Sequence, residues 1–132
     1  MIDFEVKIFN NVHEAVAPLC AKNRFVSTPI ENYANIPAAS LYEIGNRTIT
    51  MRQSSTPVEN YAWITYQADV VASSKAKCRE IFKTLDERMI SMNFSRTGSP
   101  VYITYPDNSG IVRYTARYEA EVDTEGNLYR RP

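Results

Sequence analysis

The stretch from Glu59 to Phe94 constrains the fold most, because its hydrophobic period changes from that of a strand to that of a helix. From position 62 every second residue is apolar, small or aromatic, which predicts a strand with one face in a core. That face consists of Ala62, Ile64, Tyr66, Ala68 and Val70. The opposite face carries Tyr61, Trp63, Thr65, Gln67 and Asp69.

A helix is predicted directly after this strand. Ser73-Ser74 offers a hydroxyl that can cap the first free amides of a helix. From Lys75 to Met92 the apolar residues recur at helical spacing, and Asn93 suits the left-handed conformation that ends a helix. The apolar stripe consists of Cys78, Ile81, Phe82, Leu85, Met89 and Met92. Because this stripe is about as long as the apolar face of the strand, we expect the helix to lie across a sheet.

The whole chain, residues 1–132, is expected to form a single domain, since this length suffices to bury one core. Its formal net charge is zero, which argues against nucleic acid or an anionic membrane as the main partner but leaves room for a local basic patch. No apolar run approaches the roughly 20 residues needed to cross a bilayer, and no signal peptide is recognisable. Cys20 and Cys78 fall in predicted helices, which favours buried free thiols in a reducing cytoplasm.

A first helix is predicted at the N-terminus, with Asp3 as its cap. Apolar residues recur there at helical spacing. They are Phe4, Ile8, Val12, Ala15, Val16 and Leu19. Pro18 lies inside this pattern, and a proline removes one backbone donor and clashes with the preceding turn. A kink or an early end of the helix is therefore expected near Pro18.

Two strands are predicted after a long connection. The connection runs from Asn23 to Pro37 without a sustained period, and only Phe25-Val26 is expected to be extended. The strands, Ala38–Ile44 and Arg47–Gln53, are expected to form a hairpin at Gly45-Asn46, because these residues accept the positive φ that a tight turn requires.

The C-terminal third is predicted to add further antiparallel strands. One strand is expected around Val101–Tyr105 and a longer one over Ile111–Val122, with a turn between them at Asp107–Gly110. After a second turn at Asp123–Asn127, Leu128–Arg131 is expected to fold back as a short last strand. The resulting order is helix, strand, strand, strand, helix, strand, strand. It predicts an α+β fold, a mostly antiparallel sheet of about five strands with two helices packed on one face.

Catalytic chemistry has little support in the sequence. His13 is the only histidine, and a zinc-protease helix would need a second one where Ala17 stands. The four glycines all stand apart, so the sequence contains no glycine-rich phosphate loop. Neither cysteine lies in a motif that would supply a histidine base. We therefore expect a protein that is not an enzyme, and we predict no catalytic residue, no cofactor and no metal ligand.

The strand face that the helix does not cover is the feature best suited to function. Tyr61 and Trp63 point away from the predicted core, and large aromatics on an open sheet face indicate another layer or another chain. The predicted subunit interface consists of Tyr61, Trp63, Gln67, Arg113 and Arg117. The alternative is that the N-terminal arm, or the loop before Pro37, covers the aromatics within the same chain.

A single-strand nucleic-acid binding module is the alternative from another functional class. The chain has nine tyrosines and one tryptophan, and aromatics with arginines on a sheet can stack bases and neutralise phosphates. Arg113 and Arg117 share a strand face that would serve this purpose, and Arg96 is expected nearby. Glu119 and Glu121 continue the same face, however, and give it a mixed charge.

Several stretches of the chain resemble the small tail-terminator, or tail-completion, proteins of tailed bacteriophages and related tail-like particles. They are Asp3-Phe4-Glu5-Val6-Lys7-Ile8-Phe9-Asn10 at the start, Glu59-Asn60-Tyr61-Ala62, Asp86-Glu87-Arg88-Met89 with the exit Asn93-Phe94-Ser95-Arg96, and Arg113-Tyr114-Thr115-Ala116-Arg117-Tyr118-Glu119 with the turn at Asp123. The order of elements also matches across most of the chain. Where the family commonly has glycine before the phenylalanine at the helix exit, this chain has Asn93, and both residues suit that position.

The resemblance implies a structural protein of the virion, without catalytic residues or a cofactor. Tail terminators form a hexameric ring that ends the tail tube and joins it to the head. The implied partners are further copies of the chain, the tail tube protein and the head–tail connector or stopper protein, with no membrane and no sequence-specific nucleic acid. The implied location is the tail end or neck of the virion, after assembly in the host bacterial cytoplasm. A neck or head-completion protein on the portal side is the alternative within this setting.

Overall fold

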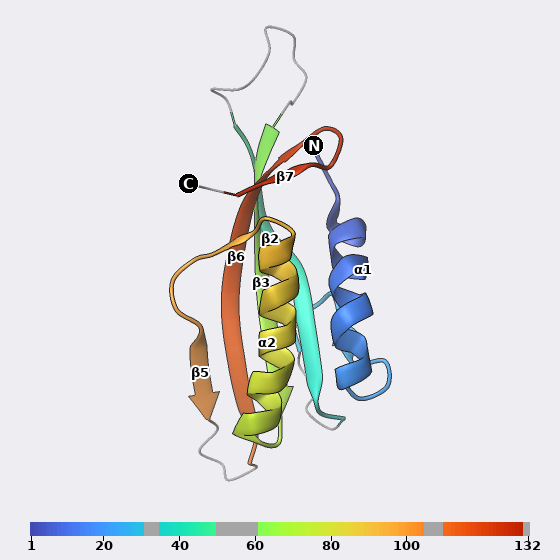
Figure 1. The fold of residues 1–132 in the computed structure, drawn as a ribbon, viewed down its shortest axis with the longest axis vertical. Helices are drawn as coiled ribbons and strands as arrows, with labels where there is room; N and C mark the ends of the chain where they lie inside the picture. Colours follow the sequence, from blue (N-terminus) through green and yellow to red (C-terminus); the bar gives the residue numbers. More distant parts are fainter. Residues whose placement is uncertain (31–34, 50–60, 105–109, 131–132) are drawn as a thin grey trace, which may run out of the picture.

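Three long strands form the centre of the structure, and β3 lies between the other two (Figure 1). They are β2 (Ala38–Thr48), β3 (Tyr61–Ala72) and β6 (Val112–Asp123). The computed structural model describes residues 1–30, 35–49, 61–104 and 110–130. β3 is antiparallel to both neighbours and pairs with β6 over all 12 of its residues. The strands predicted from the alternation near Trp63 and near Arg117 are thereby confirmed.

Among the described residues, four short strands complete the sheet. They are β1 (Phe25–Val26), β4 (Ser95–Arg96), β5 (Val101–Thr104) and β7 (Leu128–Tyr129). β1 pairs in parallel with β2, whereas β4, β5 and β7 all pair antiparallel with β6. The predicted mostly antiparallel sheet is confirmed. The sequence did not indicate β4, because two residues are too few to establish a period.

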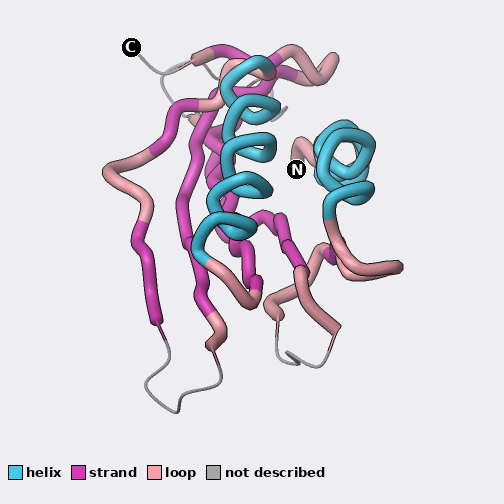
Figure 2. Tube along the Cα trace, turned by 60° about the horizontal axis from the view of Figure 1, so that its bottom comes forward, coloured by secondary structure: helices cyan, strands magenta, loops and turns pink. Residues whose placement is uncertain are grey.

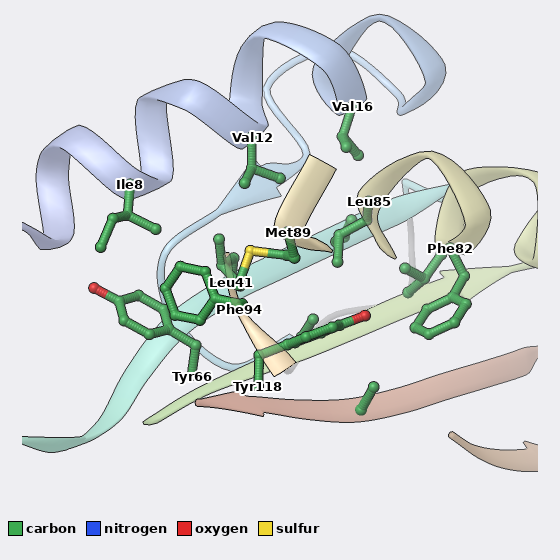
Figure 3. Close-up of a cluster of buried hydrophobic side chains, with 14 of the residues drawn as sticks. Ile8, Val12, Val16, Leu41, Tyr66, Phe82, Leu85, Met89, Phe94 and Tyr118 are labelled. Carbon is green, nitrogen blue, oxygen red and sulfur yellow. The ribbon is translucent and has the colours of Figure 1, made fainter. Parts of the chain in front are cut away.

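Both helices lie on one face of the sheet, as predicted (Figures 1 and 2). α1 (Glu5–Val16) lies beside β2, and α2 (Lys75–Ser91) lies across β3 and β6. Their buried side chains meet those of the sheet in one core (Figure 3). The helices contribute Ile8, Val12, Val16, Cys78, Ile81, Phe82, Leu85 and Met89 to it. The helix-on-sheet arrangement predicted from the apolar stripe of α2 is therefore what the chain adopts.

The predicted hairpin at Gly45-Asn46 is wrong. β2 runs without a turn through both residues, with a bulge between Glu43 and Gly45. Gly45 pairs with Thr65, and a Cβ at this position would make only an ordinary contact of 3.5 Å with the Thr65 side chain. The glycine therefore marks a bulge, which is a second common use of glycine in strands. The pairing continues to Ile49, and the rest of the predicted second strand lies outside the described residues.

The signals at the ends of α2 act as the sequence predicts. The hydroxyl of Ser74 accepts a hydrogen bond from the amide of Lys77 at 3.2 Å and so caps the helix. Asn93 has a φ of 75°, in the left-handed region, and the helix ends just before it. These two short polar residues fix the length of the helix that covers the sheet.

The predicted break near Pro18 is also confirmed. α1 ends at Val16, and the chain continues as a short 3₁₀ helix, Ala17–Leu19, with the proline in its first turn. The predicted cap, Asp3, lies one residue before the N-cap position, which is occupied by Phe4, although its Oδ1 accepts from the amide of Glu5 at 3.1 Å. Cys20 was expected inside a helix, but it follows the 3₁₀ helix, because the proline ends the helical pattern earlier than the apolar spacing suggests.

Replacing Leu85 with alanine should lower the free energy of unfolding by about 2–5 kcal/mol, because its side chain is fully buried between α2 and the sheet. Urea unfolding measures the loss. Lys83→Ala, on the exposed side of the same helix, is the control and should change the free energy by less than about 0.5 kcal/mol. An equally small change for Leu85→Ala would contradict the packing of α2 on the sheet.

Candidate functional site

The sheet face that points away from the helices, which we call the open face, is the candidate site. It alternates along each long strand with the residues buried under the helices. Its members include Ser40, Tyr42 and Arg47 of β2, Tyr61, Trp63, Thr65, Gln67, Asp69 and Val71 of β3, and Arg113, Thr115, Arg117, Glu119 and Glu121 of β6. All five residues of the predicted interface lie on this face, but the structure places them in two groups.

One end of the open face is covered by the chain itself. Ile30, Ala38 and Val71 form a small buried cluster, separate from the main core. Ile36, which directly precedes Pro37, packs against this cluster. The described part of the connection between β1 and β2 therefore covers one end of the open face, but the alternative in which it covers Tyr61 and Trp63 is wrong. The covered end is the far end of β3, roughly 26 Å along the strand from Trp63.

The middle of the open face holds a buried carboxylate, Asp69, that accepts hydrogen bonds from all three long strands. Its Oδ1 lies 3.0 Å from Nη2 of Arg113 and 2.6 Å from the hydroxyl of Thr115. Its Oδ2 lies 3.2 Å from the hydroxyl of Tyr42. Two weaker contacts, both at 3.5 Å, come from the hydroxyl of Ser40 and the amide nitrogen of Gln67.

This arrangement offsets the cost of burying a charge. A buried carboxylate destabilises a fold unless a cation and hydrogen-bond donors surround it. Asp69 is 0% exposed and its partner Arg113 is 21% exposed, so the pair is shielded from water. Burial and the carboxylate both raise the pKa of Tyr42, which keeps its hydroxyl protonated and able to donate. The network thereby ties β2, β3 and β6 together on the side that the helices do not reach.

The network changes the roles of two predicted interface residues. Arg113 and Gln67 turn toward Asp69, so they belong to an internal network of the chain. Arg117 stays exposed, with its Nε donating to Oε1 of Gln67 at 3.3 Å. Sequence reasoning missed Asp69 because it appeared as one more polar residue of an alternating strand. The sequence did contain a signal that Asp69 has a special role, because aspartate is rare in strands and this one stands inside a strand, directly before Val70.

The other end of the open face holds the aromatic group. Trp63 is half-buried and lies in a hollow of about 490 Å³ that also includes Arg47, Thr65 and Glu119. Tyr61 is half-buried next to Tyr129 of β7, with 6.3 Å between the ring centroids. The predicted residues Tyr61 and Trp63 thus lie together in an aromatic patch with charged neighbours.

The N-terminal arm lies on the helix side of the sheet. Ile2 is buried in the main core, and its carbonyl oxygen accepts from Nδ2 of Asn46 at 2.7 Å. Asn46 pairs with Ile64, whose side chain is buried under the helices. The alternative in which this arm covers the aromatics of the open face is therefore wrong, because the apolar residues of the arm are drawn into the core instead.

The histidine and the two cysteines take part in packing. His13 lies edge-on to Phe25, with ring centroids 5.6 Å apart. Burial raises the pKa of both thiols, Cys20 and Cys78, to about 11, so they are protonated and poorly nucleophilic at neutral pH. The described part of the chain contains no cluster of three metal-ligating acidic, histidine or cysteine side chains, and none of its helices is long and apolar enough to cross a membrane.

Comparison with known proteins gives no family for this chain. Its sequence matches no protein-family model and no curated protein.

Replacing Asp69 with asparagine should lower the free energy of unfolding by about 3–5 kcal/mol. Arg113 would lose its buried ion-pair partner, and the new side-chain NH₂ group would face hydroxyl groups that now donate to the carboxylate. Glu87→Gln, on the exposed side of α2, is the matched control and should change it by less than about 0.5 kcal/mol. Urea unfolding compares the two. If Asp69→Asn behaves like the control, the network does not hold the three strands together.

Proposed function

We propose that this chain is a structural protein of a bacteriophage tail, a tail terminator whose copies form a hexameric ring that ends the tail tube and joins it to the head. The observation that carries the proposal is the aromatic end of the open face around Trp63. A half-buried tryptophan there shares a hollow with charged side chains, on a sheet face that no described helix covers. Such a surface is suited to contact with another chain.

The strand register supports this use of the surface. Trp63 stands between Arg47 of β2 and Glu121 of β6, so an aromatic side chain is flanked across the sheet by opposite charges. Interface energy concentrates in buried tryptophan, tyrosine and arginine residues surrounded by a polar rim. Tyr61 and the exposed Arg117 extend the same surface along the strands. The contact that we propose is therefore centred on Trp63, with Tyr61 and Arg117 beside it.

A closed ring also needs two unlike surfaces on each subunit, because a head-to-tail contact joins different patches. The open face around Trp63 supplies one of them, and we place the second on the α1 side of the helix layer, away from β5 and α2. The partners in the proposal are further copies of the chain, the tail tube protein and the connector or stopper protein. The ring is assembled in the host cytoplasm and resides at the tail end of the virion.

The two alternatives differ in how well the geometry supports them. A neck or head-completion protein on the portal side would use the same kind of surface, and imaging of particles separates it from a terminator. A single-strand nucleic-acid binding module receives less support. Arg113, one of its two candidate phosphate-binding residues, is paired with the buried Asp69, and Glu119 lies beside the other one, Arg117.

Replacing Trp63 with alanine should weaken ring formation, or binding to tail ends, by about 2 kcal/mol while the monomer keeps its unfolding midpoint. The physical reason is that the indole ring would be buried by the neighbouring copy rather than by its own core. Sedimentation velocity measures assembly, and urea unfolding of the same sample measures monomer stability.

Tyr102→Ala serves as the control, since Tyr102 is half-buried on β5 and packs on the helix side of the sheet. It should leave assembly unchanged. Intact assembly of the Trp63→Ala variant, together with a monomer destabilised by about 3–5 kcal/mol, would refute the interface and mean that the chain itself buries this side chain.

A further inference from the structure

A second surface, the α2 groove, lies on the helix layer and is not part of the open face. It has a volume of about 540 Å³ and follows the flank of α2 above β6. Its lining residues are Ala76, Arg79, Glu80, Phe82, Lys83, Asp86 and Tyr114. Figure 3 shows Phe82 projecting from α2 toward the sheet on this flank. The groove lies on the side of the sheet opposite Trp63.

The floor of the groove is aromatic. The rings of Phe82 and Tyr114 are stacked, with centroids 5.4 Å apart and an interplanar angle of 18°. Tyr102 of β5 extends this surface, with its ring centroid 4.9 Å from that of Tyr114. The ammonium group of Lys75 lies 4.9 Å from the centroid of Tyr102. An aromatic surface of this kind favours a flat or apolar side chain placed against it.

The wall of the groove carries two cations and two carboxylates. Arg79 and Lys83, one turn apart on α2, are exposed and make no ion pair with a described residue. The two carboxylates that line the groove are already engaged. Asp86 accepts from Arg96 at 2.9 Å and from the hydroxyl of Tyr118 at 2.7 Å. The second, Glu80, lies 3.7 Å from Nζ of Lys77.

We propose that the α2 groove binds an extended segment of another protein in which an aromatic or large aliphatic side chain is flanked by carboxylates. The apolar side chain would lie against Phe82 and Tyr114, and the carboxylates would pair with Arg79 and Lys83. Charge-assisted hydrogen bonds to arginine would fix the orientation of the bound segment, and the aromatic floor would bury the apolar side chain. This interaction is independent of the proposed ring contact, and both surfaces can be occupied in the same molecule.

Nucleic acid fits the groove less well than an acidic segment does. A phosphate backbone presents closely spaced negative charges along its whole length, whereas the groove offers two cations on one wall. The formal net charge of zero also removes the long-range attraction on which binding of polyanions depends. A segment with a few discrete carboxylates can instead place them at the two cations.

A labelled synthetic peptide, acetyl-Gly-Glu-Glu-Phe-Glu-Gly, tests the proposal by fluorescence anisotropy with the full chain. We expect saturable binding that weakens about tenfold or more in the double variant Arg79→Glu/Lys83→Glu. Replacing the peptide's phenylalanine with alanine should weaken it similarly. Lys7→Glu/Lys22→Glu changes the net charge by the same amount at exposed positions outside the groove, and it should bind like the unmodified chain.

Three results would overturn the proposal. The first is the absence of saturable binding up to about 1 mM peptide. The second is an equal loss in both double variants, which would mean that net charge rather than the groove attracts the peptide. The third is evidence that something else occupies the groove. Single-stranded DNA would be the occupant if it binds more tightly than the peptide and depends on Arg79 and Lys83. A second copy of the chain would be the occupant if the peptide does not bind and the Arg79→Glu/Lys83→Glu variant loses self-association. Unchanged unfolding midpoints for both double variants verify that each remains folded.

Discussion

The register between β3 and β6 is the constraint on which the rest of the structure depends. A shift of one residue would exchange the two faces of a strand, so that charged side chains of β6 would enter the core and Tyr118 would leave it. Two independent interactions enforce the observed register. The apolar stripes of the helices cover one face, while Asp69 binds Arg113 and Thr115 on the other. Because both faces favour the same pairing, the sheet has one stable arrangement.

The elements that the sequence predicts well are those in which a period extends over many residues. The strand around Trp63, the helix containing Leu85 and the strand around Arg117 all have such a period, and short polar signals at Ser74 and Asn93 mark the helix ends. Gly45-Asn46 was misinterpreted because glycine serves turns and bulges equally, and only the pairing partner decides between them.

The candidate site was predictable in part. Alternation alone places Tyr61, Trp63 and Arg117 on one face, but it says nothing of how side chains on neighbouring strands engage one another. The pairing of Asp69 with Arg113 depends on a register between strands that are far apart in the sequence. The α2 groove has a similar origin, since Phe82 and Tyr114 meet only after α2 has packed on the sheet. Both features belong to the tertiary structure.

We propose that this chain forms one ring at the end of a tail tube through the open face around Trp63. Electron cryomicroscopy of phage particles whose genome encodes the chain tests it most directly. We predict a single ring of six copies between the last tube ring and the head connector, with Trp63 buried at each contact between neighbouring copies. Density for the chain along the length of the tube, or its absence from the tail, would contradict the account.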